Sequence, residues 1–187
     1  MIKATAFILI GGNSERFGSP KWKATISGQS VLDRIWNSCD SFEKRYVIGK
    51  EKPDSISYHF FKDELDIQAP INGLYTALNY SNSDWNFIIS CDLPLMTKEI
   101  IQSLWTLGNH DADAIVPMVN DYFQLTCAFY HKRILKQIPR QIEEGDLSLH
   151  GLLNSIKMEM VIMDDNENEF TNMNTVENLS KIKVIEN

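Results

Sequence analysis

Apolar runs of strand length alternate with helical patterns along the chain of 187 residues. The first run, residues 6–10, is apolar throughout and ends at Gly11 and Gly12, which is typical of a strand buried on both faces. This alternation predicts an α/β fold of three layers, in which helices cover both faces of a mostly parallel, twisted sheet. No linker-like stretch divides the chain, so we expect residues 1–187 to form one domain.

The remaining elements are predicted from the same patterns. Further strands are expected at residues 46–48, 58–61, 85–90, 114–117, 123–130 and 158–163. Helices are expected at 31–39, at 74–80 directly after Gly73, from the cap Thr97 to residue 107, at 135–142 and at 149–156. A last helix is expected after Asn174, which would cap it, with Glu177 three residues further on.

The composition argues against two classes of protein. Eighteen basic and 25 acidic residues give a net charge of −7, which disfavours binding of nucleic acid through its phosphates but leaves a small phosphate-bearing ligand open. The apolar stretch at residues 4–10 is far shorter than the roughly 20 residues that cross a bilayer, and it has no basic flank or cleavage site. Three widely spaced cysteines in apolar runs are typical of buried thiols. We therefore expect a cytoplasmic protein that contacts neither nucleic acid nor membrane.

The first candidate site follows the first predicted strand. Ligands of such sheets bind outside the carboxyl ends of the strands. Gly11 and Gly12 would let the backbone turn tightly and present its N–H groups to an anion, and Arg16 and Lys21 add positive charge. The spacing fits neither a P-loop nor a dinucleotide fingerprint. We interpret the segment as a phosphate site, with an ordinary strand-to-helix turn as the alternative.

Two aspartates follow other predicted strands. Asp92 comes directly after residues 85–90, where an unpaired carboxylate is expensive to bury, and Mg²⁺ chelated by phosphates would be a suitable partner. The alternative is a turn aspartate before Pro94. For Asp63 alone, a turn cap is the favoured interpretation. Gly73 would either let a helix N-terminus approach a ligand closely or simply start a helix.

Asn172 and Asn174 form a fourth candidate. Their side chains would point the same way in an extended segment, where paired amides suit a ligand or metal-bound waters. Asparagine-rich turns are the common alternative.

These four places, in this order, resemble the motifs of the molybdenum cofactor guanylyltransferase family. Residues 9–21 (LIGGNSERFGSPK) resemble the family's L-A-G-G-x-S-x-R-M-G-x-D-K, and residues 69–73 (APING) are similar to G-P-L-x-G. Residues 91–94 (CDLP) match C-D-x-P, and residues 172–177 (NMNTVE) are similar to N-x-N-T-P-E. The chain departs from the family pattern at Ile10, Pro20, Gly49, Ala69 and Val176.

The resemblance implies a glycosyltransferase-A-like, Rossmann-like nucleotidyltransferase fold. It also implies a Mg²⁺-dependent enzyme that transfers GMP from GTP to the terminal phosphate of molybdopterin and releases pyrophosphate. GTP and molybdopterin would be its small-molecule partners, with transient contacts to cofactor-synthesis or recipient proteins. The nucleotide would be bound by Leu9, Ile10, Gly11, Gly12, Asp63 and Gly73.

In the same resemblance, Lys21 and Arg16 would act on the phosphates and Asp92 would hold Mg²⁺. Asn172 and Asn174 would lie on the acceptor side. Phosphoryl-type transfer needs positioning and charge neutralisation more than a covalent nucleophile, and these residue types suit that need.

Other functions remain open from the sequence. A cytidylyltransferase or another nucleotidyltransferase acting on a phosphorylated small molecule would use the same chemistry. A non-catalytic nucleotide-binding adaptor would keep the fold and the binding residues, and a scaffold would bind no nucleotide.

Overall fold

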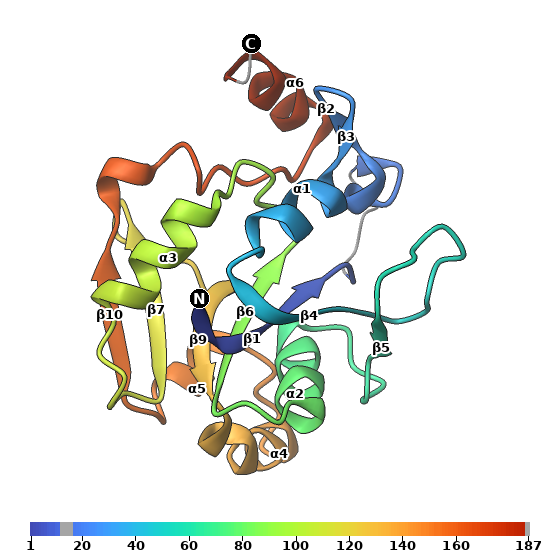
Figure 1. The fold of residues 1–187 in the computed structure, drawn as a ribbon. Helices are drawn as coiled ribbons and strands as arrows, with labels where there is room; N and C mark the ends of the chain where they lie inside the picture. The colour runs from blue at the N-terminus through green and yellow to red at the C-terminus, as the bar shows by residue number, and fades with distance from the viewer. Residues whose placement is uncertain (12–16, 186–187) are drawn as a thin grey trace.

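The computed structural model describes residues 1–11 and 17–185. Its main sheet runs in the order β10-β7-β9-β6-β1-β4-β5, with β8 paired to β7 (Figure 1). One half of the sheet consists of β1 (Ile2–Leu9), β4 (Phe42–Gly49), β5 (Phe60–Lys62) and β6 (Trp85–Ser90). The other half consists of β7 (Ala114–Val119), β8 (Tyr122–Phe123), β9 (Cys127–His131) and β10 (Met158–Ile162).

The sheet is mostly parallel, as predicted, with one reversed strand inside it. β1 pairs in parallel with β4 and β6, β4 with β5, and β7 with β10. β9 is antiparallel to both of its neighbours, β6 and β7. The single strand predicted at 123–130 is therefore wrong, because the chain turns between β8 and β9 and Gln124 N donates to the carbonyl of Pro117.

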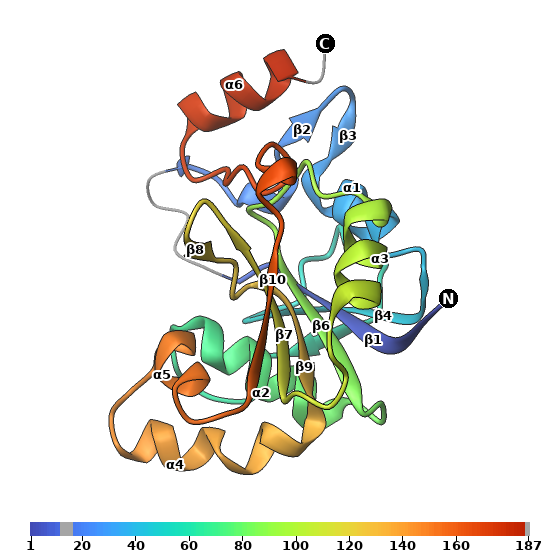
Figure 2. The same ribbon diagram turned by 90° about the vertical axis from the view of Figure 1, so that its left-hand side faces the viewer.

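Helices cover both faces of this sheet, which confirms the predicted three layers (Figures 1 and 2). One face packs on α1 (Val31–Ser38) and α3 (Lys98–Leu107). The other packs on α2 (Pro70–Tyr80), α4 (Ile138–Glu143) and α5 (Leu149–Leu153). Along β1, Ala6 and Ile8 join the first core and Phe7 and Leu9 the second, as the period of two in a strand requires.

Several predicted boundaries shift for local reasons. β1 and β4 begin four residues before the predicted runs, because the exposed side chains of Lys3, Glu43 and Lys44 interrupt the apolar pattern there. α2 begins at Pro70, so Gly73 lies inside the helix instead of before it. Proline suits the first helical position, since its missing N–H would have no partner there.

Shorter elements complete the fold. A hairpin of β2 (Thr25–Ile26) and β3 (Gln29–Ser30) turns through Ser27 and Gly28, both at positive φ, and was not predicted. The 3₁₀ helices are η2 (Lys21–Lys23), η3 (Lys132–Lys136) and η4 (Asp164–Asn166). Among the described helices, none is long and apolar enough to cross a membrane. Cys39, Cys91 and Cys127 are buried free thiols, as predicted.

The last helix, α6 (Val176–Ile185), lies next to the β2–β3 hairpin in both views (Figures 1 and 2). The predicted cap Asn174 is wrong by one residue. Thr175 Oγ1 accepts from Asn178 N, and Asn178 Oδ1 accepts from Thr175 N in return, so these two residues form the reciprocal cap.

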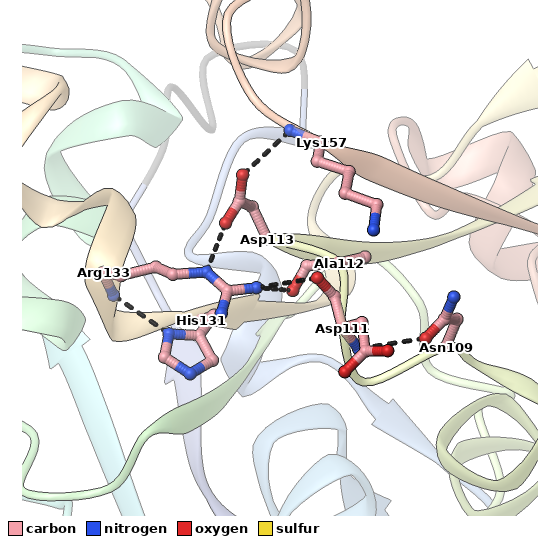
Figure 3. A network of polar contacts seen from close by, with 7 residues as sticks. All are labelled: Asn109, Asp111, Ala112, Asp113, His131, Arg133 and Lys157. Carbon is pink, nitrogen blue, oxygen red and sulfur yellow. Dashed lines mark hydrogen bonds and ion pairs between the residues drawn. The ribbon is translucent and has the colours of Figure 1, made fainter.

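A cluster of hydrogen bonds and one ion pair lies where β7 and β10 begin and β9 ends. Asp113, just before β7, accepts hydrogen bonds from the Arg133 guanidinium and from Lys157 N, the latter at 2.9 Å (Figure 3). Arg133 also donates to the carbonyls of Asp111 and Ala112. The cluster joins the start of β7 to the segments that follow β9 and precede β10.

Candidate functional site

The register of the sheet gathers the predicted site residues at one edge. Leu9 lies opposite Ser90 on β6 and Ile48 on β4, and Gly49 lies opposite Lys62 on β5. The strands therefore end level with one another, and Gly11, Asp63 and Asp92 follow them at the same edge. Gly12 and Arg16 lie outside the described residues.

A pocket of about 600 Å³ opens at this edge. Its walls come from the ends of β1, β4, β5 and β6, from the start of α2 and from the residue before β9. It is lined by Leu9, Gly11, Ile48, Lys50, Asp63, Ile67, Gln68, Ala69, Pro70, Gly73, Ser90 and Thr126. A pocket of this size suits a small organic ligand such as a nucleotide.

A smaller pocket of about 190 Å³ continues from it on the side of β6. The two share Leu9, Gly11, Pro70, Ser90 and Thr126 in their walls. Lys21 and Asp92 line only the smaller pocket, and Lys50 and Asp63 line only the larger one. The combined groove thus has one lysine and one aspartate at each end.

Hydrogen bonds hold both the side chain and the backbone of Asp92. The Ser90 hydroxyl donates a hydrogen bond of 2.5 Å to Asp92 Oδ1, and the Asp92 carbonyl accepts from Met173 N at 2.7 Å. The preceding residue, Cys91, donates its N–H to the carbonyl of Leu9 at 3.1 Å. The two backbone bonds fix the chain at residues 91 and 92, and the bond from Ser90 orients the carboxylate at the pocket wall.

Lys21 is held over the smaller pocket by a distant part of the chain. Its ammonium group donates a hydrogen bond of 2.7 Å to Asn174 Oδ1. Asn172 and Asn174 are both exposed, and Met173 between them is fully buried. Asn174 thereby joins the lysine, whereas Asn172 lines neither pocket.

Gly73 brings α2 against the central strand. A Cβ atom at this position would lie 2.8 Å from Leu9 Cδ2 and 2.9 Å from Leu9 Cδ1. Leu9 is buried and lines both pockets, so the close approach of helix and strand shapes the groove at its centre. The glycine therefore serves helix–strand packing and borders the larger pocket at the same time.

Ile10 and Gly49, two of the departures from the family pattern, belong together in space. A Cβ atom at Gly49 would lie 2.9 Å from Ile10 Cγ1 and 3.5 Å from the Phe60 ring. The larger side chain after β1 therefore occupies the space that a side chain at the end of β4 would need. The two departures compensate each other sterically.

Electrostatics differ between the two ends of the groove. Burial raises the pKa of Asp63, and the positive charge of Lys50 opposes this rise. Lys50 also donates to Gln68 Oε1 at 3.3 Å, which holds it at the rim of the larger pocket. Burial, and secondarily the charge of Asp92, raise the pKa of Cys91, so this thiol in the smaller pocket stays protonated and is no nucleophile.

Several residues that line the groove were not predicted as site residues, and Ser90, Lys50, Thr126 and Trp22 are the informative cases. Ser90 directly precedes Cys91 and Lys50 directly follows β4, so the rule that strand ends carry ligands contains the signal for both. Thr126 reaches the edge only because β9 is antiparallel, which the sequence did not indicate. Trp22 was interpreted as packing; it packs against the core and also lines the smaller pocket.

The donor set fits a magnesium ion that arrives with phosphates. The described residues contain no group of three or more histidine, cysteine, aspartate or glutamate side chains that could hold a metal by themselves. Mg²⁺ in nucleotide sites is held by one or two carboxylates together with phosphate oxygens and waters. The single carboxylate of Asp92, at the wall of a pocket that also holds Lys21, suits that arrangement.

Comparison with known proteins identifies the family. Residues 6–159 match the model of the MobA-like NTP transferase domain. A protein of Aquifex aeolicus (strain VF5) named "Probable molybdenum cofactor guanylyltransferase" is 34% identical over 187 residues, which cover 98% of this chain and 92% of that one.

Solved structures share the fold. A crystal structure of a protein from Aquifex aeolicus VF5 superposes with a TM-score of 0.78 at 29% identity, covering 94% of this chain and 96% of that one. Molybdopterin-guanine dinucleotide biosynthesis protein A from Archaeoglobus fulgidus superposes with a TM-score of 0.84 at 18% identity, covering 97% of each chain, and at this identity shows the fold alone. The matched region spans the strand ends and α2 that form the groove, and the chain therefore belongs to the MobA-like NTP transferase domain family.

Proposed function

We propose that this chain is a molybdenum cofactor guanylyltransferase, acting as one nucleotidyltransferase domain. It transfers GMP from GTP to the terminal phosphate of molybdopterin. A phosphate oxygen of molybdopterin forms a bond to the α-phosphorus of GTP, and the bond from that phosphorus to the bridging oxygen breaks, so that pyrophosphate leaves. The observation that carries the proposal is the groove itself, in which Lys21 and Asp92 line one end and Asp63 the other. Family membership and the named relative agree with it.

In this proposal the nucleotide lies along the groove. Its base and ribose occupy the larger pocket between Leu9, Gly73 and Asp63, and its phosphates reach the smaller pocket beside Gly11 and Lys21. The volumes, about 600 and 190 Å³, support this order, because the bulky nucleoside needs the larger space. Lys21 then stabilises negative charge on the phosphates during transfer.

Five further residues complete the assignment. Ile10 borders the smaller pocket, and its side chain also shields the end of β4. Asn174 orients Lys21. Asn172, two residues before it and also exposed, is assigned to the acceptor side by its resemblance to the family motif. Gly12 and Arg16 belong to the phosphate segment by their resemblance to the family motif.

Asp92 is the residue that would hold Mg²⁺ together with the phosphates. When bound, the ion neutralises phosphate charge. The chain's own contribution is to orient this carboxylate through Ser90, to hold the Asp92 backbone through Met173, and to place Lys21 within the same pocket.

The experiment is reconstitution with Mg²⁺, molybdopterin and each of GTP, CTP, ATP and UTP, with the dinucleotide product sought by chromatography and pyrophosphate measured in parallel. We expect product and pyrophosphate with GTP. Transfer from CTP alone would show that the protein is a cytidylyltransferase and not a guanylyltransferase. Thermal protection by GTP without pyrophosphate release would make the protein a nucleotide-binding adaptor.

A further inference from the structure

Ser90 differs from the other groove residues because it contacts the candidate metal ligand directly. It is the last residue of β6, lines both pockets, and its hydroxyl lies 2.5 Å from Asp92 Oδ1. An ionised carboxylate accepts hydrogen bonds only, so the hydroxyl is the donor. The same hydroxyl lies 3.4 Å from Asp92 N. Ser90 lies outside all four family motifs, so the resemblance does not imply either contact.

The serine is itself held rigidly. Its N–H donates to the carbonyl of Thr126 at 2.9 Å, and its register partner on β1 is Leu9. The hydroxyl therefore projects from a central strand paired on both sides. A hydrogen-bond donor on such a strand restricts the rotation of the carboxylate two residues further along.

We infer that Ser90 is a positioning residue for Asp92: its hydroxyl occupies Oδ1 and thereby presents Oδ2 to the cation that accompanies the nucleotide phosphates. This inference rests on the proposed function for the identity of the nucleotide. The hydrogen bond selects one carboxylate orientation before the metal arrives. Losing it leaves the charge of Asp92 intact and lets the carboxylate rotate, which weakens metal binding without removing the ligand. Outer-shell partners of this kind are typically worth about 10- to 100-fold in metal affinity or activity.

The test compares Ser90→Ala, Ser90→Thr and the control Ser83→Ala. Threonine keeps a hydroxyl and suits a strand. Ser83 is also half-buried and makes one side-chain hydrogen bond, of 2.7 Å to Thr5 Oγ1, outside the groove. Binding of Mn²⁺ in the presence of GTP, followed by electron paramagnetic resonance, reports metal affinity without turnover. Thermal unfolding of each variant checks that it is folded.

We expect Ser90→Ala to weaken Mn²⁺ binding by about 10- to 100-fold and to raise the Mg²⁺ concentration needed for half-maximal turnover by a similar factor. Ser90→Thr should restore most of the affinity, and Ser83→Ala should bind Mn²⁺ as the wild type does. Equal Mn²⁺ affinity in folded Ser90→Ala and wild type overturns the positioning role. An equal loss of Mn²⁺ affinity in Ser90→Ala and Ser83→Ala would also overturn the positioning role.

Failure of the proposed function gives a different pattern. If the wild type binds Mn²⁺ with GTP, and Ser90→Ala weakens this binding, but no pyrophosphate is released with molybdopterin, the positioning role stands and the guanylyltransferase assignment falls. If the wild type binds no metal with GTP, both are overturned.

Discussion

The ammonium group of Lys21 donates a hydrogen bond to Asn174 Oδ1 at 2.7 Å, although 153 residues separate the two along the chain. The contact ties the segment after β1 to the segment before α6. Met173 N, one residue away, donates to the carbonyl of Asp92. The C-terminal segment therefore touches both the candidate phosphate lysine and the candidate metal aspartate.

Lys21→Ala is expected to lower the rate of pyrophosphate release by roughly 10²–10³, the scale of removing a preorganised charge-stabilising group. Asn174→Ala should lower it by only about tenfold, since it removes one hydrogen bond to a charged group and leaves the lysine in place. Steady-state kinetics with GTP measure both variants. Lys23→Ala, in the same 3₁₀ helix but outside both pockets, is the matched control. A loss in Lys23→Ala equal to that in Lys21→Ala would contradict a specific role for Lys21.

Asp92→Asn is expected to cost roughly 10²–10³ in turnover, because the amide is similar in size but no longer supplies a negative oxygen to Mg²⁺. Chelation of divalent cations with EDTA should abolish turnover of the wild type, and added Mg²⁺ should restore it. Thermal unfolding of Asp92→Asn should stay near that of the wild type. Near-normal turnover by this variant would remove Asp92 from the metal site.

Gly73→Ala is expected to destabilise the protein by about 1–3 kcal/mol, because the added methyl would lie within 2.8–2.9 Å of the buried side chain of Leu9. Alanine's better helix propensity, roughly 0.5–1 kcal/mol, opposes this and is the smaller term. Chemical denaturation measures the change. In a Leu9→Ala background the cost should shrink, since space is then available for the methyl. A Gly73→Ala protein as stable as the wild type would show that the helix shifts freely away from β1.

Asp63→Asn is expected to stabilise the protein at neutral pH. Because burial raises the pKa of Asp63 above its ordinary value of 3.8, the folded protein binds this proton more tightly than the unfolded chain does. The free energy of unfolding therefore falls as pH rises from 3.8 through the raised pKa of Asp63. Asparagine carries no titrating proton, so the variant does not lose this free energy. Its stability advantage over the wild type should therefore increase as pH rises. Denaturation at pH 4 and pH 7 tests this, with the exposed Asp66→Asn as the control; an advantage that shrinks toward pH 7 would contradict it.

Asp113→Asn should behave in the opposite way. Burial acts to raise the pKa of Asp113, but the hydrogen bonds from Lys157 N and Arg133 outweigh it, and the net pKa is lowered (Figure 3). Its contribution to stability is present above the unfolded value near 3.8 and is lost as pH falls through the lowered folded pKa. The variant should therefore lose on the order of 1 kcal/mol at pH 7, and this deficit should shrink in acid. Denaturation of Asp113→Asn at the same two pH values tests this, with Asp111→Asn as the control. A loss of stability in Asp113→Asn that does not change with pH would contradict the expectation.

The sequence alone determined the features that depend on local patterns. The strand pattern at residues 85–90, with the apolar run 87–89 at its centre, predicted β6 to the residue and placed Asp92 just after it. The hydroxyl of Thr97 capped α3 as expected, accepting from Ile100 N. Such features are encoded within a few residues, by periodicity and by the capacity of one side chain to satisfy a free amide.

Tertiary structure alone decided which distant segments meet. The reversal of β9, which brings Thr126 to the groove, depends on pairing with β6 and β7, and no local pattern specifies it. The bond between Lys21 and Asn174 and the fit of Ile10 over Gly49 arise for the same reason. Each contact needs two segments that the packing of the whole sheet brings together. Hydrogen bonds and steric exclusion act only over a few ångströms, and the chain between the partners can take many paths until the core forms.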